Sequence, residues 1–187
     1  MTDLDDRRLV DAVARRGDPR AFRALYDRHT PAMYGLALRL AAGAEADAED
    51  VVHDAWIRAV ERFDSFEWRS ALRSWLCGFV VHRWREVRRA RGREASGAEA
   101  APGDLWPDEP SALDARLDAT ADRVDLERVV RRLADGYREV LVLHDVHGFT
   151  HDEIGALLGI EAGTSKSQLS RARRILRQSL NESGGAP

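Results

Sequence analysis

The chain has 187 residues, of which 44% are apolar and 33% are charged. This length allows one medium domain or two small ones, each with a packed core. The acidic N-terminus lacks the basic and apolar parts of a signal peptide, and every apolar run is too short to cross a bilayer. The single cysteine, Cys77, excludes an internal disulfide and a cysteine-rich metal site. We therefore expect a cytoplasmic protein without membrane insertion.

Charge is distributed unevenly along the chain. The formal net charge is −3, which by itself argues against a polyanionic partner. Residues 73–93, however, hold seven arginines and one acid, and residues 163–180 hold five basic residues and no acid. The segment between these two stretches is acidic. Because local potential rather than net charge governs anion binding, the pattern predicts two anion-binding surfaces.

Helices are predicted throughout the first half of the chain, where apolar residues recur at every third or fourth position. Gly17 is suited to end the first helix. Asp18 followed by Pro19 is typical of a helix start, with the acid as N-cap and the proline in the first turn. These helices can bury one shared core. The first two expected helices cover residues 4–16 and 19–40, and two further apolar stripes run through residues 48–63 and 72–80, within a domain of residues 1–92.

Residues 93–121 differ in composition from the segments on either side. They are rich in alanine, glycine, acids and proline, and their apolar residues are too sparse to offset the entropy of ordering. We predict a flexible acidic linker. Leu105 and Trp106 are the exceptions, and they are either docking residues or part of a solvated spacer.

A second helical block follows the linker and completes an all-α protein of two small helical domains. Its helices are again predicted from apolar residues at helical spacing. The expected helices cover residues 124–133, 137–146, 151–158 and 164–180, within a domain of residues 122–182 that is followed by a disordered tail of residues 183–187.

The most informative stretch runs from residue 148 to residue 174. Thr150 and Glu153 have the spacing of a capping box, and Gly159 is suited to end the helix that they start. Thr164 is expected to cap a second helix. Two helices joined by so short a turn predict a helix-turn-helix, whose second helix reads DNA. The alternative is a solvated basic helix in an ordinary bundle, but the coincidence of caps, glycine stop and acid-free face favours the DNA reader.

Residues 133–174 resemble region 4 of bacterial sigma factors of the extracytoplasmic-function group, in which a Tyr-Arg-Glu-Val-Leu-like helix precedes the helix-turn-helix. The first half of the chain agrees with this resemblance. Segments 21–29, 48–63 and 72–76 resemble region 2 of the same family, in the family's order. The resemblance implies a factor that binds core RNA polymerase, directs it to promoters and helps to open the DNA.

The resemblance also implies a polymerase-binding helix. In the family, the helix that matches residues 47–62 packs against a coiled coil of the largest polymerase subunit. We expect Asp54 to face solvent there, whereas Trp56 either contacts the partner or fills the domain's own core. The candidates for polymerase binding are Asp50, His53, Asp54, Trp56 and Ile57.

A second implied site recognises the −10 promoter element. Residues 64–70 match the loop that holds a flipped base, for which aromatic faces offer stacking. The helix of residues 72–91 then offers arginines to the separated strand. Trp84 lies away from Trp75 and Phe79, and it either contacts DNA or is a partly exposed packing residue. The candidates are Phe66, Trp68, Arg69, Arg73, Arg83, Trp84, Arg85 and Arg88.

A third implied site recognises the −35 element. The N-terminal part of the second helix of a helix-turn-helix enters the major groove, where basic and hydroxyl side chains can donate to base edges. Ser165 and Gln168 depart from the family, which usually has valine and arginine at these positions. The candidates are Thr164, Lys166, Ser167, Gln168, Ser170, Arg171 and Arg174.

The implied partners are core RNA polymerase, through its largest and second-largest subunits, promoter DNA and a cognate anti-sigma factor. The sequence has no phosphate-binding glycine loop or nucleophile elbow, so we expect no catalysis and no cofactor. His144, His147 and His151 share a helical spacing, but Gly148 interrupts the helix, so we expect no metal site. The main alternative is a two-domain helix-turn-helix regulator that acts without the sigma role.

Overall fold

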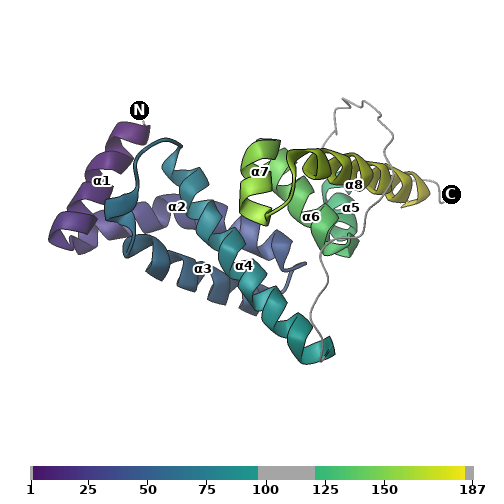
Figure 1. Ribbon diagram of the computed structural model, residues 1–187, viewed down its shortest axis with the longest axis horizontal. Coiled ribbons are helices and arrows are strands. Elements are labelled where there is room, and N and C mark those ends of the chain that lie inside the picture. The colour runs from purple at the N-terminus through teal and green to yellow at the C-terminus, as the bar shows by residue number, and fades with distance from the viewer. Residues whose placement is uncertain (1, 97–120, 184–187) are drawn as a thin grey trace. The chain divides into compact units, whose positions relative to one another are not determined.

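The structure is a computed structural model that describes residues 2–96 and 121–183. Every secondary-structure element in these two ranges is a helix, which confirms the all-α prediction (Figure 1). The chain divides into two compact units, Met1–Ala100 and Ala101–Pro187. Each unit has buried apolar residues of its own. Within the described ranges, no helix is both long enough and apolar enough to span a membrane.

Local sequence signals set the helix boundaries of the first unit. Gly17 adopts a positive φ of 59°, which ends the first helix. The Asp18 carboxylate accepts hydrogen bonds from the backbone N–H groups of Arg20, at 2.8 Å, and Ala21, at 3.3 Å, with Pro19 in the first turn. Both signals behave as predicted. The elements of this unit are α1 (Thr2–Arg16), α2 (Pro19–Leu40), α3 (Glu45–Val60), the 3-10 helix η1 (Phe63–Ser65) and α4 (Leu72–Ser96).

Helices α2, α3 and α4 pack against one another and share one core. Each contributes an apolar stripe at helical spacing, as predicted for amphipathic helices. Burying one such large aliphatic side chain stabilises the fold by about 1.5–3 kcal/mol. The largest fully buried side chains of this core are Leu25, Met33, Leu36, Leu40, Val51, Leu72, Leu76, Val80 and Val81.

A buried carboxylate of α1 bonds to two side chains of α2. Asp6 of α1 is 3% exposed. Its Oδ1 accepts a hydrogen bond from Nη1 of Arg28 at 2.5 Å, and its Oδ2 lies 3.1 Å from Nε2 of His29. A carboxylate this deeply buried requires such partners. The contacts therefore fix the position of α1 along α2.

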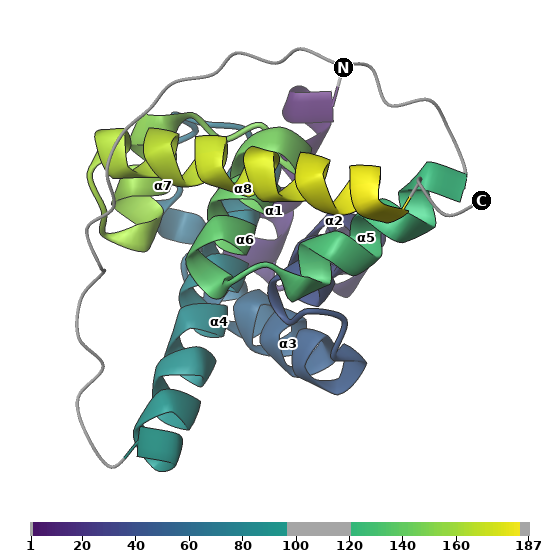
Figure 2. The same cartoon turned by 90° about the vertical axis from the view of Figure 1, so that its right-hand side faces the viewer.

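The second unit is arranged around its C-terminal helix. This helix, α8, packs against α5, α6 and α7, and Figure 2 shows it lying across them. Its inward stripe contains Leu169, Ala172 and Leu176, as predicted. The elements of this unit are α5 (Ala121–Arg132), α6 (Asp135–Leu141), the π-helical turn η2 (Val142–Val146), α7 (His151–Leu158) and α8 (Ala162–Ser183).

Helices α7 and α8 form the predicted helix-turn-helix. The Thr150 hydroxyl accepts from the backbone N–H of Glu153, and the Glu153 carboxylate accepts from the Thr150 N–H at 2.8 Å, which completes the capping box. Gly159 ends α7 with a φ of 65°. The N–H of Ile160 then bonds back to the carbonyl of Gly155 at 3.1 Å, so the chain turns within a few residues.

Helix α8 begins earlier than predicted. It starts at Ala162, and the carbonyl of Glu161 already accepts a hydrogen bond from the N–H of Ser165. Thr164 therefore lies inside the helix and does not cap it. The hydrogen bond from the Ile160 N–H to the Gly155 carbonyl closes the turn, so the chain returns to a helical conformation directly after it.

Two further boundaries differ from the sequence-based expectation. Helix α4 continues to Ser96, four residues past the predicted domain end at Gly92, since the arginine, glutamate and alanine that follow are good helix formers. The predicted helix over residues 137–146 is divided into α6 and η2. Leu105 and Trp106 of the predicted linker lie outside the described residues.

Candidate nucleic-acid and partner interfaces

One face of α3 presents three predicted partner-binding residues to solvent. Asp50, His53 and Ile57 are exposed and follow one another at spacings of three and four residues, which places them on one helix face. Ile57 is 48% exposed, which makes it one of the few large apolar side chains of the described ranges that stand in solvent. An apolar group between polar ones is typical of the centre of a protein interface.

Trp56 belongs to the core, although it was among the partner-binding candidates. It is 3% exposed. Its Nε1 donates to Oγ1 of Thr30 at 3.0 Å, and its ring lies 5.6 Å from that of Phe22 and 5.5 Å from that of Tyr26. The satisfied indole N–H and the aromatic contacts explain why this tryptophan faces α2 rather than a partner.

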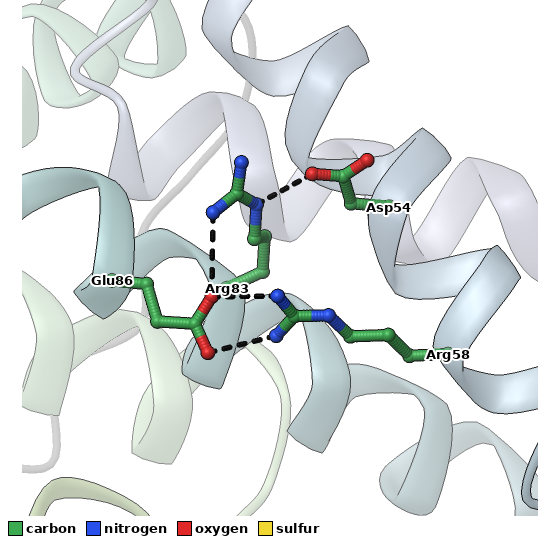
Figure 3. A network of polar contacts seen from close by, with 4 residues as sticks. All are labelled: Asp54, Arg58, Arg83 and Glu86. Atoms are coloured by element: carbon green, nitrogen blue, oxygen red, sulfur yellow. Dashed lines mark hydrogen bonds and ion pairs between the residues drawn. The ribbon is translucent and has the colours of Figure 1, made fainter.

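Asp54 does not stand free in solvent, which corrects the expectation. Its Oδ2 lies 2.6 Å from Nε of Arg83 on α4, and its side chain is 35% exposed. Arg83 also reaches Glu86, which in turn receives two hydrogen bonds from Arg58 of α3, at 2.8 and 2.7 Å (Figure 3). These four residues form a network that joins α3 to α4, and we refer to it below as the α3–α4 ion-pair network.

The pKa values of the acids that join α3 to α4 reflect these contacts. The bidentate hydrogen bonds from Arg58 hold the pKa of Glu86 below its ordinary value, and they raise the pKa of Arg58. Farther along α4, Arg91 makes two hydrogen bonds of 2.6 Å to Asp47, which lower the pKa of that carboxyl. Charged, bidentate pairs of this kind fix the orientation of two helices as well as attract them.

The loop that precedes α4 holds two aromatic candidates in different environments. Phe66 is 7% exposed, and its ring lies 4.8 Å from that of Trp75. It therefore packs against α4 and is not available to a base. Trp68 is half-buried and lies 4.6 Å from Phe66. Of the two, only Trp68 has surface to offer a ligand.

The remaining −10 candidates differ in how far their side chains are exposed to solvent. Arg69 and Arg73 are exposed, and Arg69 pairs with Glu67 at 2.6 Å. Trp84 is 6% exposed and therefore cannot be a DNA contact in this conformation. The buried stripe of α4 runs through Leu76 and Val80, and four further residues along the helix bring Trp84 to the same face. Arg83, Arg85 and Arg88 are half-buried.

The outer face of α8 carries most of the predicted −35 residues. Thr164, Lys166, Ser167 and Arg174 are exposed, and Ser170 and Arg171 are half-buried. Gln168 is different, because its side chain lies against the start of α6 next to Gly136. It is thus turned toward the unit's interior and not toward the exposed face.

Two side-chain contacts of α8 with other elements were not predicted from the sequence. The Asp145 carboxylate receives hydrogen bonds from Nε and Nη2 of Arg173 at 3.0 and 2.6 Å, and these bonds help to lower its pKa against the opposing effect of burial. Ser165 is fully buried, and its hydroxyl lies 2.9 Å from Nδ1 of His151. The first contact ties α8 to η2 at the surface, and the second ties the buried start of α8 to α7.

Two weaker sequence signals have structural explanations. The rings of His144 and His151 stack at 4.6 Å. Within the described part of the chain, no group of three or more potential ligands converges on a metal position. Cys77 is buried, and burial raises the pKa of its thiol to about 11, so it is a neutral packing residue.

Two protein-family models match this chain, one in each unit. Residues 25–94 match the family model described as "Sigma-70 region 2", and residues 123–176 match the one described as "Sigma-70, region 4". The chain belongs to the sigma-70 family of RNA polymerase sigma factors, in its extracytoplasmic-function group. The two matches cover α3, most of α2 and α4, and most of the second unit, whereas α1 of this sigma factor lies outside them.

Individual relatives support the same assignment. The sigma factor is 32% identical to RNA polymerase sigma factor CnrH of Cupriavidus metallidurans, over 94% of this chain and 95% of the relative. It is 30% identical to ECF RNA polymerase sigma factor SigM of Mycobacterium tuberculosis, over 88% of this chain and 79% of the relative. Among solved structures, it resembles sigma factor RpoE of Bartonella quintana in complex with the anti-sigma factor NepR. The TM-score is 0.62 at 29% identity, over 86% of this chain and 96% of that one.

Proposed function

We propose that this sigma factor contacts promoter DNA with both units while the exposed face of α3 holds core RNA polymerase. The observation that supports this most directly is the separation of faces on α3. Asp50, His53 and Ile57 are exposed, whereas Trp56 is engaged within the unit. A face that mixes polar groups with one exposed aliphatic side chain fits a partner helix. The same partners are expected from the family, namely the largest and second-largest polymerase subunits.

For the −10 element, we assign the DNA contacts to Trp68 and the exposed arginines beside it. Trp68 offers a ring on which an extruded base can stack, which offsets part of the cost of unstacking the duplex. Arg69 and Arg73 are close in sequence to it and are exposed, so they are suited to contact phosphates of the separated strand. Phe66 and Trp84 serve as packing residues.

For the −35 element, the proposal rests on the exposed side chains in the first turns of α8. Lys166 and Ser167 are nearest to the helix-turn-helix turn and are suited to read base edges in a major groove. Arg171 and Arg174 follow on the outward side, where arginines contact guanine or phosphate. Gln168 is not part of this reading surface.

Regulation by an anti-sigma factor is a further part of the proposal. The solved relative RpoE is described in complex with the anti-sigma factor NepR. We infer that this chain, too, has an antagonist that covers its polymerase-binding surfaces, and that both proteins act in the cytoplasm. We expect no catalytic function of its own and no cofactor or metal.

The test is transcription in vitro with core RNA polymerase and a promoter library randomised in its −10 and −35 elements. The expected result is enrichment of one −10 and one −35 sequence at a fixed spacing, and only when the sigma factor is present. Lys166→Ala should change the selected −35 sequence and leave the −10 sequence as it was. Selection of a single duplex element by the chain without polymerase would favour the alternative, a helix-turn-helix regulator without the sigma role.

A further inference from the structure

Trp68 has a backbone conformation that a tryptophan rarely adopts. Its φ is +58°, in the left-handed region that favours glycine. Such a conformation persists only where the surroundings hold it in place, and it concentrates at ligand-binding positions. The contacts around the indole ring therefore decide how Trp68 is presented.

One of these contacts comes from α1, far away in the sequence. The guanidinium carbon of Arg7 lies over the Trp68 ring, 5.2 Å from its centroid. This distance is within the range in which a cation is attracted to the face of an aromatic ring. The other ring contact comes from Phe66, at 4.6 Å, which is anchored in the core through Trp75.

The position of Arg7 is itself determined by the fold. Its neighbour Asp6 is buried and bound by Arg28 and His29, so α1 cannot slide along α2 without breaking these contacts. Helix α1 also packs on η1, the turn that leads into the loop of Trp68. The guanidinium is therefore held above the loop by the helix that carries it.

We propose that Arg7 is a positioning residue that holds the Trp68 ring for a flipped base and thereby contributes to base selectivity at the −10 element. The inference rests on the proposed role of Trp68 in −10 recognition. Helix α1 lies outside the segment that the region 2 family model matches. It thus gives this sigma factor a selectivity determinant that the matched segment does not contain.

The test uses full-length sigma factor with core RNA polymerase and a promoter library randomised in the −10 element. Arg7→Met removes the charge and keeps the aliphatic stem, and Arg7→Lys retains a cation. Arg8→Met is the matched control, because Arg8 is an exposed neighbour on the same helix and loses the same charge. Trp68→Ala and the double variant Arg7→Met with Trp68→Ala complete a double-mutant cycle.

Arg7→Met is expected to lower the preference for the favoured base at one −10 position by about two- to fivefold, the strength of an exposed cation–π contact. The −35 preference and the affinity for core polymerase should stay unchanged, Arg7→Lys should retain most of the preference, and Arg8→Met should behave like the native chain. The double variant should be no less selective than Trp68→Ala alone.

Two outcomes would overturn the inference and can be told apart. If Trp68→Ala lowers −10 selectivity but Arg7→Met does not, or if their effects add, Arg7 does not act through Trp68. If Trp68→Ala leaves −10 selectivity unchanged, the proposed role of the loop fails, and the inference fails with it.

Discussion

Ile57 and Trp56 are adjacent in sequence but have opposite environments. Trp56 is 3% exposed and hydrogen-bonded to Thr30, whereas Ile57 is 48% exposed. Substitution of Trp56 would therefore report on the stability of the unit. Substitution of Ile57 would report on what binds to it.

Ile57→Glu should weaken the complex with core RNA polymerase while the fold stays intact. A charged side chain at the centre of an apolar contact typically costs about 1–2 kcal/mol or more, which is roughly a five- to thirtyfold loss of affinity. Thermal unfolding of the free protein should change little, since surface substitutions usually lie within about 0.5 kcal/mol. The measurement is a competition assay for core polymerase.

Ala24→Glu is a matched control for this variant, since it adds the same charge at an exposed position of α2. It should bind core polymerase like the native chain. Equal affinity of the Ile57→Glu and native proteins would show that the α3 face is not the polymerase contact. Asp54→Arg is a less informative probe, because the new guanidinium would face Arg83 and Arg58 and disturb the packing of α4 on α3.

At the scale of the elements, the α3–α4 ion-pair network makes the packing of two helices depend on pH. The hydrogen bonds from Arg58 lower the pKa of Glu86 in the folded protein below its ordinary value of 4.5. A carboxyl with a lowered folded-state pKa stabilises the fold at pH values above its unfolded pKa. That contribution is lost as the pH falls through the folded-state pKa.

Glu86→Gln should therefore reduce the free energy of unfolding at pH 7 by about 1 kcal/mol or less, because the network is partly exposed to solvent. The difference from the native chain should shrink toward zero as the pH falls below 4.5 and passes through the lowered folded-state pKa of Glu86. Urea unfolding of both proteins at several pH values measures it. Glu49→Gln, at an exposed position of α3, is the control. A stability difference that stays constant with pH would contradict the assigned role of the network.

Alanine is unfavourable at two glycines of the helix-turn-helix for different reasons, a steric clash at Gly155 and a positive φ at Gly159. A Cβ on Gly155 would lie 2.8 Å from the carbonyl oxygen of Ile160, so the turn itself would have to shift. A Cβ on Gly159 would meet nothing within 4 Å, but the φ of 65° is unfavourable for alanine. Gly159→Ala should thus cost about 1–2 kcal/mol of stability and retain −35 recognition. Gly155→Ala should cost about 1–3 kcal/mol and also impair −35 recognition.

Urea unfolding and promoter selection with the reconstituted polymerase, applied to both variants, distinguish these effects. The comparison would fail if Gly159→Ala changed the selected −35 sequence while Gly155→Ala did not.

What could be predicted from the sequence follows from how local each signal is. The Asp18 cap, the Thr150 and Glu153 capping box and the stop at Gly159 depend on residues within one turn, and all are present in the structure. The face of Trp84 was predicted wrongly although its signal is also local: Trp84 follows the buried Val80 by four residues, whereas the expectation compared it with Trp75 and Phe79. The pair of Asp54 and Arg83 joins helices that are distant in sequence, so no spacing rule within one helix could reveal it.

At the scale of the whole molecule, function is divided between two compact units with small candidate surfaces. A specific protein–DNA interface usually buries about 1,000–2,500 Å² of protein. On α8 the exposed candidates are Thr164, Lys166, Ser167 and Arg174, and at the −10 site they are Arg69 of the loop and Arg73 of α4. Neither set is large enough for such an area. We therefore expect core polymerase to supply the additional contacts and to hold the two units at the promoter spacing.

We accordingly predict that the purified sigma factor alone binds the selected promoter duplex no more tightly than the micromolar range at physiological salt, with little preference over unrelated DNA. With core polymerase, the same duplex should be bound in the nanomolar range or tighter. Arg174→Ala should weaken this complex similarly on all sequences and flatten its salt dependence, as expected for a phosphate contact. Electrophoretic mobility or fluorescence anisotropy titrations at several salt concentrations measure both quantities. Nanomolar, sequence-specific binding by the free chain would show that its own surfaces suffice, as in a regulator that acts without polymerase.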